Sequence, residues 1–95
     1  MKIIWSPEAS ADLDRIVDHL LADQPVSALP TLDRIEERVR ALRDHPALGR
    51  PGRVMGTREL VLTGLPYVVP YRVKSGRIEI VRVLHAARLW PRGFE

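Results

Sequence analysis

The chain of 95 residues contains no cysteine. Disulfides and cysteine-held metals are therefore excluded, and the absence is what a reducing compartment favours. No apolar run approaches the ~18 residues that a membrane helix needs, and the residues after Met1 lack the apolar core of a signal peptide. The sequence predicts a single soluble, cytoplasmic domain over residues 1–95 without membrane association. Because so small a domain buries little surface, its stability must come from good packing or from a partner.

Familiar catalytic motifs are also missing. The sequence has no glycine-rich phosphate loop and no nucleophile elbow. The histidines His19, His45 and His85 do not have the spacing of metal ligands, so we expect no metal and no cofactor. His19 falls beside an apolar helical stripe, and His45 falls at a helix end where the helix dipole favours it. His85 is therefore the histidine left as a candidate for chemistry.

Charge is distributed unevenly along the chain. Residues 1–48 carry six basic and nine acidic side chains, whereas residues 49–95 carry nine basic and three acidic ones. The basic side chains of the second half are almost all arginine, which suits an anionic partner. An arginine-rich solvated surface explains the same composition equally well.

Two amphipathic helices are predicted in the first half. Ser6-Pro7-Glu8 has the residues of a helix start, and Gln24-Pro25 ends that helix. A second helix is predicted over roughly 26–45, with Pro30 either at its true start or kinking its first turn. The short link predicts an antiparallel hairpin. Its apolar stripes comprise Leu13, Ile16, Leu20, Leu32, Ile35, Val39 and Leu42.

The remaining segments have strand-like patterns. Strands are predicted over residues 2–5, 57–62, 67–73 and 78–85, with a loop over 46–56. The order β-αα-βββ predicts an α+β fold in which the helical hairpin packs on an antiparallel sheet. Pro70 removes a backbone donor in the middle of a strand, so a bulge is expected there. Simple alternation along 78–85 puts Val83 and His85 on the face opposite Ile78 and Ile80.

Several residues of the predicted sheet are candidates for binding or catalysis. His85 ends the last strand, where an imidazole serves either acid–base chemistry or a structural hydrogen bond. Arginine side chains bind phosphate in bidentate fashion, and tyrosines sharing a face either stack on a base or pack across strands. Trp90 is expected to anchor the C-terminal segment by packing. The candidate binding residues are Arg58, Tyr67, Tyr71, Arg82, His85, Arg88 and Trp90.

An ordered set of motifs carries a resemblance. They are Ile-Ile-Trp-Ser-Pro-Glu-Ala near the N-terminus, Asp-His-Pro-Ala-Leu-Gly-Arg-Pro-Gly after the second helix, Arg58-Glu59-Leu60, Tyr67-Val68-Val69-Pro70-Tyr71-Arg72-Val73 and Ile78-Glu79-Ile80-Val81-Arg82-Val83-Leu84-His85. Together they resemble the RelE/ParE toxin superfamily over nearly the whole chain. The resemblance implies the toxin of a type II toxin–antitoxin system, with growth inhibition, plasmid stabilisation and neutralisation by a cognate antitoxin in a hetero-oligomer.

The two main branches of that superfamily act on different targets. RelE-like members cut mRNA on the ribosome, whereas ParE-like members poison DNA gyrase. RelE-like toxins carry an arginine in a Tyr-Arg-Leu-Val-Tyr run, and the matching position here is Val68. With valine at this position and an Arg-Val-Leu-His ending, the sequence is more similar to the ParE-like branch. In that branch the residue at the position of His85 is not known to be catalytic. A gyrase poison is therefore expected, with no firm catalytic residue.

Two other functions are weighed beside it. One is a ribosome-dependent mRNA endonuclease using His85 with Arg58 or Arg88. The other is a degenerate toxin that retains only antitoxin binding. Fold similarity alone does not choose among the three.

Overall fold

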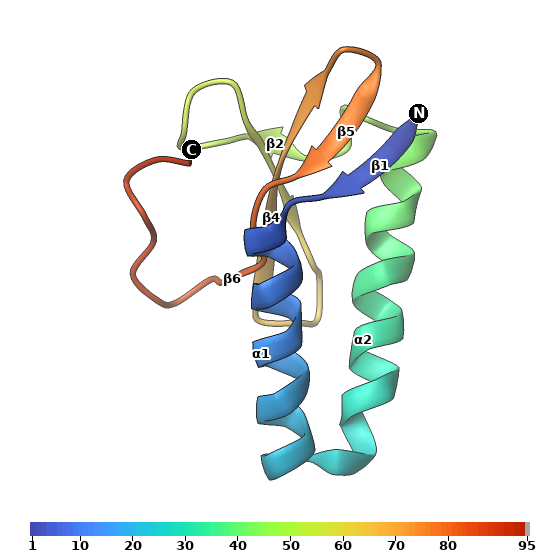
Figure 1. Cartoon of the computed structure of the whole chain (residues 1–95), viewed down its shortest axis with the longest axis vertical. Helices are drawn as coiled ribbons and strands as arrows, with labels where there is room; N and C mark the ends of the chain where they lie inside the picture. The colour runs from blue at the N-terminus through green and yellow to red at the C-terminus, as the bar shows by residue number, and fades with distance from the viewer. Residues whose placement is uncertain (95) are drawn as a thin grey trace.

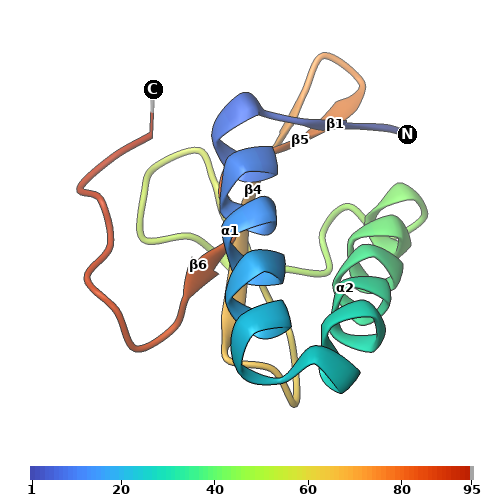
Figure 2. The same ribbon diagram turned by 60° about the horizontal axis from the view of Figure 1, so that its bottom comes forward.

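A two-helix hairpin packs against a six-stranded sheet (Figure 1). The computed structural model describes residues 1–94. In chain order the elements are β1 (Lys2–Trp5), α1 (Pro7–Asp23), α2 (Pro25–Arg40), the 3-10 helix η1 (Ala41–Arg43), β2 (Arg50–Pro51), β3 (Arg58–Val61), β4 (Tyr67–Lys74), β5 (Arg77–Ile80) and β6 (Leu84–His85). Figures 1 and 2 show the two helices side by side. The predicted α+β fold is confirmed.

The sheet has the strand order β1-β5-β4-β3-β2, and β6 pairs with the start of β4. All neighbouring strands are antiparallel except β1 and β5, which are parallel. The first strand therefore joins the far side of the later hairpin, and the sheet is mixed at that one pair. The predicted loop over 46–56 also contributes the two-residue strand β2, which pairs with β3.

The helix boundaries follow from local chemistry. The Ser6 hydroxyl accepts a hydrogen bond from the Ala9 N–H at 3.0 Å and donates one to the Val81 carbonyl at 2.8 Å. This cap fixes the start of α1 against the sheet. Pro25 occupies the first position of α2, where proline is favoured. The helix continues through Pro30, so the alternative that it begins at Pro30 is wrong.

Pro70 of β4 lies opposite a break in the neighbouring strand, which is predicted over 78–85. The Pro70 carbonyl accepts from the Val81 N–H at 2.9 Å and from the Arg82 N–H at 3.5 Å. Tyr71 pairs with Ile80, but the next pair in this ladder is Val68 with Leu84. Two residues of β4 therefore stand opposite three of the neighbouring segment. The bulge expected at Pro70 is confirmed, and it divides the predicted strand into β5 and β6.

The extra residue changes which side chains share a face. Ile78, Ile80 and Val83 all lie in one core cluster. The prediction that Val83 faces away from Ile78 and Ile80 is wrong, because a one-residue bulge inverts the alternation beyond it. His85 pairs with Tyr67, which also belongs to this cluster.

The core lies between the hairpin and the sheet. Of the predicted helical stripe, Ile35, Val39 and Leu42 are fully buried, and Leu13 and Ile16 pack partly buried against the cluster. Leu20 and Leu32 are half-buried. The far end of the hairpin extends past the sheet (Figure 1). The sheet contributes Leu60, Leu62, Tyr67, Val69, Tyr71, Ile78, Ile80 and Val83.

Candidate functional site

His85 stands at the end of β6 beside the first residue of β4. Its ring meets the Tyr67 ring edge-on, with centroids 6.0 Å apart and planes at 88°. The Ala87 N–H donates to His85 Nδ1 at 3.2 Å. This contact engages one of the two ring nitrogens.

The C-terminal segment folds back over this end of the sheet. Trp90 Nε1 donates to the His85 carbonyl at 3.1 Å, and the Arg53 guanidinium lies 3.5 Å from the centroid of the Trp90 ring. A cation over an indole face is attractive. Trp90 thus anchors this segment to both β6 and the 52–57 loop, as its packing role predicts.

Arg88 is the predicted cation that lies near this pair of rings. Burial raises the pKa of Tyr67, and the positive charge of Arg88 partly offsets that effect. Arg88 is exposed. The structure therefore brings together four of the predicted residues, Tyr67, His85, Arg88 and Trp90.

Tyr71 and Arg58 instead hold the segment that follows η1. The buried Tyr71 hydroxyl donates to the Pro46 carbonyl at 2.7 Å and accepts from the Gly49 N–H at 2.8 Å. Burial raises the pKa of Tyr71, against the opposing effect of the Gly49 hydrogen bond. The Arg58 guanidinium donates to the Gly49 carbonyl at 2.8 Å. A Cβ on Gly49 would lie 2.6 Å from the Tyr71 ring, so only glycine fits there.

Arg82 is paired with a buried carboxylate on α1. Its Nε and one terminal nitrogen donate to Asp12 at 2.6 and 3.0 Å, and the Val83 N–H donates to the same carboxylate at 3.0 Å. Arg15 adds a contact at 2.6 Å. The Asp12 hydrogen bond raises the pKa of Arg82 despite its partial burial. Asp12 is 4% exposed and fixes the bulged segment to the helix.

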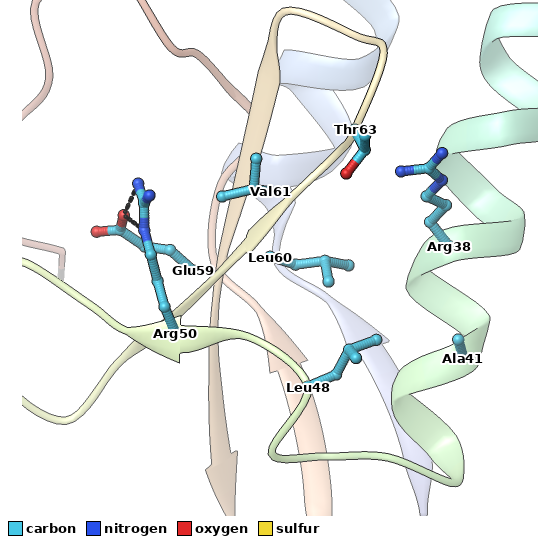
Figure 3. A pocket seen from close by; sticks show the side chains of 8 residues that line it. All are labelled: Arg38, Ala41, Leu48, Arg50, Glu59, Leu60, Val61 and Thr63. Atoms are coloured by element: carbon cyan, nitrogen blue, oxygen red, sulfur yellow. Dashed lines mark hydrogen bonds and ion pairs between the residues drawn. The ribbon is translucent and has the colours of Figure 1, made fainter.

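A groove of about 400 Å³ opens between α2 and β3 (Figure 3). Leu48 and Val61 line it while keeping 55% and 44% of their surfaces exposed, and Arg38 lies on its α2 side. β2 pairs with β3 only at Arg58 and Glu59. Beyond that point the outer edge of β3 has no strand partner among residues 1–94. An apolar groove beside an open strand edge is a site for a peptide helix or an added strand.

Glu59 forms a buried ionic cluster next to the groove. Its carboxylate is 3% exposed and accepts from Arg50 at 2.9 Å and from the Arg53 backbone N–H at 2.8 Å. Burial alone would raise the Glu59 pKa, but the hydrogen bonds from Arg53 and Arg50 lower it below its ordinary value. Because Arg53 also covers Trp90, this cluster joins β3 to the C-terminal segment.

Replacing Glu59 with glutamine should lower stability in a pH-dependent way. A carboxylate whose pKa is lower in the folded state stabilises the fold above its ordinary pKa of 4.5, and this contribution is lost as the pH falls through the folded value. Urea unfolding of Glu59→Gln should therefore show a large deficit near neutral pH and a smaller one near pH 3. The exposed Glu37→Gln is the matched control. A deficit of equal size at both pH values would contradict the prediction.

Comparison with known proteins places this geometry in a family. Over residues 3–90 the sequence matches the family described as ParE toxin of type II toxin-antitoxin system, parDE. The chain belongs to the ParE toxin family. Among relatives of this toxin, Y4kP of Sinorhizobium fredii, a candidate toxin, is 44% identical over 90 residues, covering 95% of this chain and 93% of that protein. Toxin RelE2 of Caulobacter vibrioides is 36% identical over 88 residues, covering 93% and 98%.

A solved structure agrees with the sequence relatives. A chain of the chromosomal ParDE TA system from P. aeruginosa matches the toxin with a TM-score of 0.84 and 38% identity, covering 90% of this chain and 95% of that one. The RelE/ParE resemblance is confirmed, and the protein is the toxin of a type II toxin–antitoxin system. The same homology supports an antitoxin partner.

Three further observations complete the description of the toxin. Val68, at the position where RelE-like toxins carry arginine, is 3% exposed and pairs with Val61 and Leu84. Within residues 1–94 no three histidine or carboxylate side chains gather as metal ligands. None of the helices formed by these residues is long and apolar enough to cross a membrane.

Proposed function

We propose that this toxin acts by binding and poisoning DNA gyrase and does not cleave RNA. The observation that carries the proposal is which cations and hydrogen bonds surround His85. Arg58 and Arg82 are engaged with the Gly49 carbonyl and the Asp12 carboxylate, which leaves Arg88 as the cation beside Tyr67 and His85. Val68 supplies no second cation. Phosphoryl transfer needs cations aimed at the developing charge, and losing one typically costs roughly 10²–10³ in rate.

The hydrogen bond at His85 Nδ1 supports the same proposal. A general base needs an unprotonated nitrogen directed at the attacking hydroxyl. Here the Ala87 N–H occupies Nδ1, so this nitrogen is not directed at an attacking hydroxyl. The ParE branch that the motifs resemble has gyrase as its target, and a gyrase target places the action of the toxin in the cytoplasm.

Expression of His85→Ala without antitoxin tests this proposal in cells. The variant should remain toxic and block DNA replication, because the imidazole carries no catalytic step. A control with Arg92→Ala, an exposed residue of the same segment, reports the effect of changing that segment. If His85→Ala folds and still binds antitoxin but loses toxicity, and the wild type cuts mRNA at ribosomes, the nuclease function replaces the proposed one.

We also propose that the antitoxin lays a segment in the groove between α2 and β3. The apolar surfaces of Leu48 and Val61 suit an amphipathic helix, the open edge of β3 suits an added strand, and Arg38 suits an acidic side chain at the rim. Burying these exposed apolar groups would stabilise a small domain by mass action.

Val61→Asp should therefore weaken antitoxin binding by about tenfold or more, the equivalent of ~1.4 kcal/mol. Val26→Asp is the matched control, because Val26 is 90% exposed at the hairpin turn and lies outside the groove. Titration calorimetry with the antitoxin encoded beside the toxin gives both affinities. Equal affinities for the two variants would place the antitoxin elsewhere.

A further inference from the structure

Three basic side chains lie in one row across three adjacent strands. Lys2 of β1 pairs in register with Arg77 of β5, and Arg77 pairs in register with Lys74 of β4. Residues in register point to the same face of a sheet, and neighbouring strands are about 4.8 Å apart. All three side chains are exposed. We call Lys2, Arg77 and Lys74 the basic row.

The basic row faces away from the core. The next residues along each strand, Ile3 and Ile78, contact the core cluster, so their neighbours Lys2 and Arg77 point to the opposite face. Two residues further on, Glu79 shares the face of the row, but it is already paired with Arg72 at 3.2 Å. No member of the row forms an ion pair with an acid of residues 1–94.

The turn keeps these charges close together. Ser75 and Gly76 form a two-residue connection, and both have positive φ, 54° and 72°. Serine adopts this conformation only with strain. Like charges directly opposite one another also destabilise a sheet, so the row itself opposes folding. A row of unpaired charges that lowers stability and lies on an open surface indicates that a partner binds there.

From this placement we infer that the basic row binds the phosphate backbone of duplex DNA. Three cations within about 10 Å act together, because their separation is close to the physiological screening length of ~8 Å. Flexible lysine and arginine side chains meet phosphates without reading bases. Trp5, the aromatic residue of β1, packs on the core side, so β1 adds to the row no ring of the kind on which single-stranded bases stack.

One further cation, Arg43, lies at the same end of the molecule as the row. The Met1 amino group lies 3.3 Å from the Arg43 carbonyl, which places Arg43 beside the start of β1. Figure 1 shows the β4–β5 turn, the N-terminus and the end of α2 at this same end. The inference goes beyond the gyrase proposal and does not rest on it, because binding to DNA is measured with no gyrase present.

The test uses the full chain and a fluorescent random-sequence DNA duplex at several salt concentrations. The row variant carries Lys2→Gln, Lys74→Gln and Arg77→Gln. The control variant loses the same charge at other exposed positions, through Arg34→Gln, Arg40→Gln and Arg92→Gln. Wild type should bind with a Kd of roughly 10⁻⁴–10⁻⁶ M near physiological salt. The row variant should lose about one unit of salt slope per lost contact, and the control much less.

A second readout separates loss of binding from loss of folding. Removing like-charge repulsion should leave the thermal midpoint of the row variant unchanged or raised. The inference is overturned if wild type does not bind the duplex, or if the row and control variants lose affinity equally. It is also overturned if wild type binds vesicles with anionic headgroups or single-stranded DNA more tightly than the duplex.

Discussion

Asp12→Ala is expected to remove about 3–5 kcal/mol from the free energy of unfolding, the usual cost of breaking a buried ion pair from one side. The Asp12 carboxylate accepts from Arg82, Arg15 and the Val83 N–H. Its loss leaves the Arg82 charge and the Val83 donor without their partner beside the bulge. For a domain of this size, that is a large fraction of a total stability typically near 5–15 kcal/mol.

Urea unfolding measures this loss, and α1 provides its own control. Asp14→Ala makes the same chemical change at an exposed position of the same helix and should shift stability by no more than about 0.5 kcal/mol. Asp12→Asn keeps an acceptor but removes the charge, so it should fall between the two. If Asp12→Ala and Asp14→Ala unfold alike, Asp12 is not the residue that joins α1 to the bulged segment.

Ile35→Ala is expected to cost about 2–5 kcal/mol, because it opens a cavity in a fully buried site. Ile35 belongs to the cluster formed by α2 and the sheet and has no exposed surface. Val26→Ala, on the same helix but 90% exposed, should cost far less. A thermal melt of the two variants compares them directly. Similar midpoints would contradict the packing of the α2 stripe against the sheet.

The sequence predicts the helices better than the last strands. Helical spacing identified Ile35, Val39 and Leu42 because their periodicity is local, and all three are buried. The bulge was also predictable, since Pro70 has no N–H to donate. The effect of the bulge on Val83 could not be predicted. The extra residue lies on the segment opposite Pro70, and only the pairing of the two strands decides which of them carries it.

The candidate site was only partly predictable. The neighbourhood of His85, Arg88 and Trp90 follows from their closeness in sequence at the end of the last strand. Asp12 was missed, although it stands three residues after Ala9 on the buried side of α1. The groove was missed because Leu48 and Val61 come from a loop and a strand that meet α2 only in the folded chain.

The partners of Arg58 and Arg82 also depend on the fold. In sequence they are simply arginines of a basic half that suits an anionic partner. In the structure their donors bind the Gly49 carbonyl and the Asp12 carboxylate. The unpaired cations of the sheet lie instead in the basic row, which no local motif marks because its members are brought together by strand pairing.

The most direct test of the proposed function adds purified toxin to two reactions. In the first, gyrase supercoils a relaxed plasmid; in the second, ribosomes translate a labelled mRNA. The proposal predicts that wild type and His85→Ala inhibit supercoiling alike and that the mRNA stays intact. Unchanged supercoiling together with ribosome-dependent cleavage of the mRNA, abolished by His85→Ala, would contradict it.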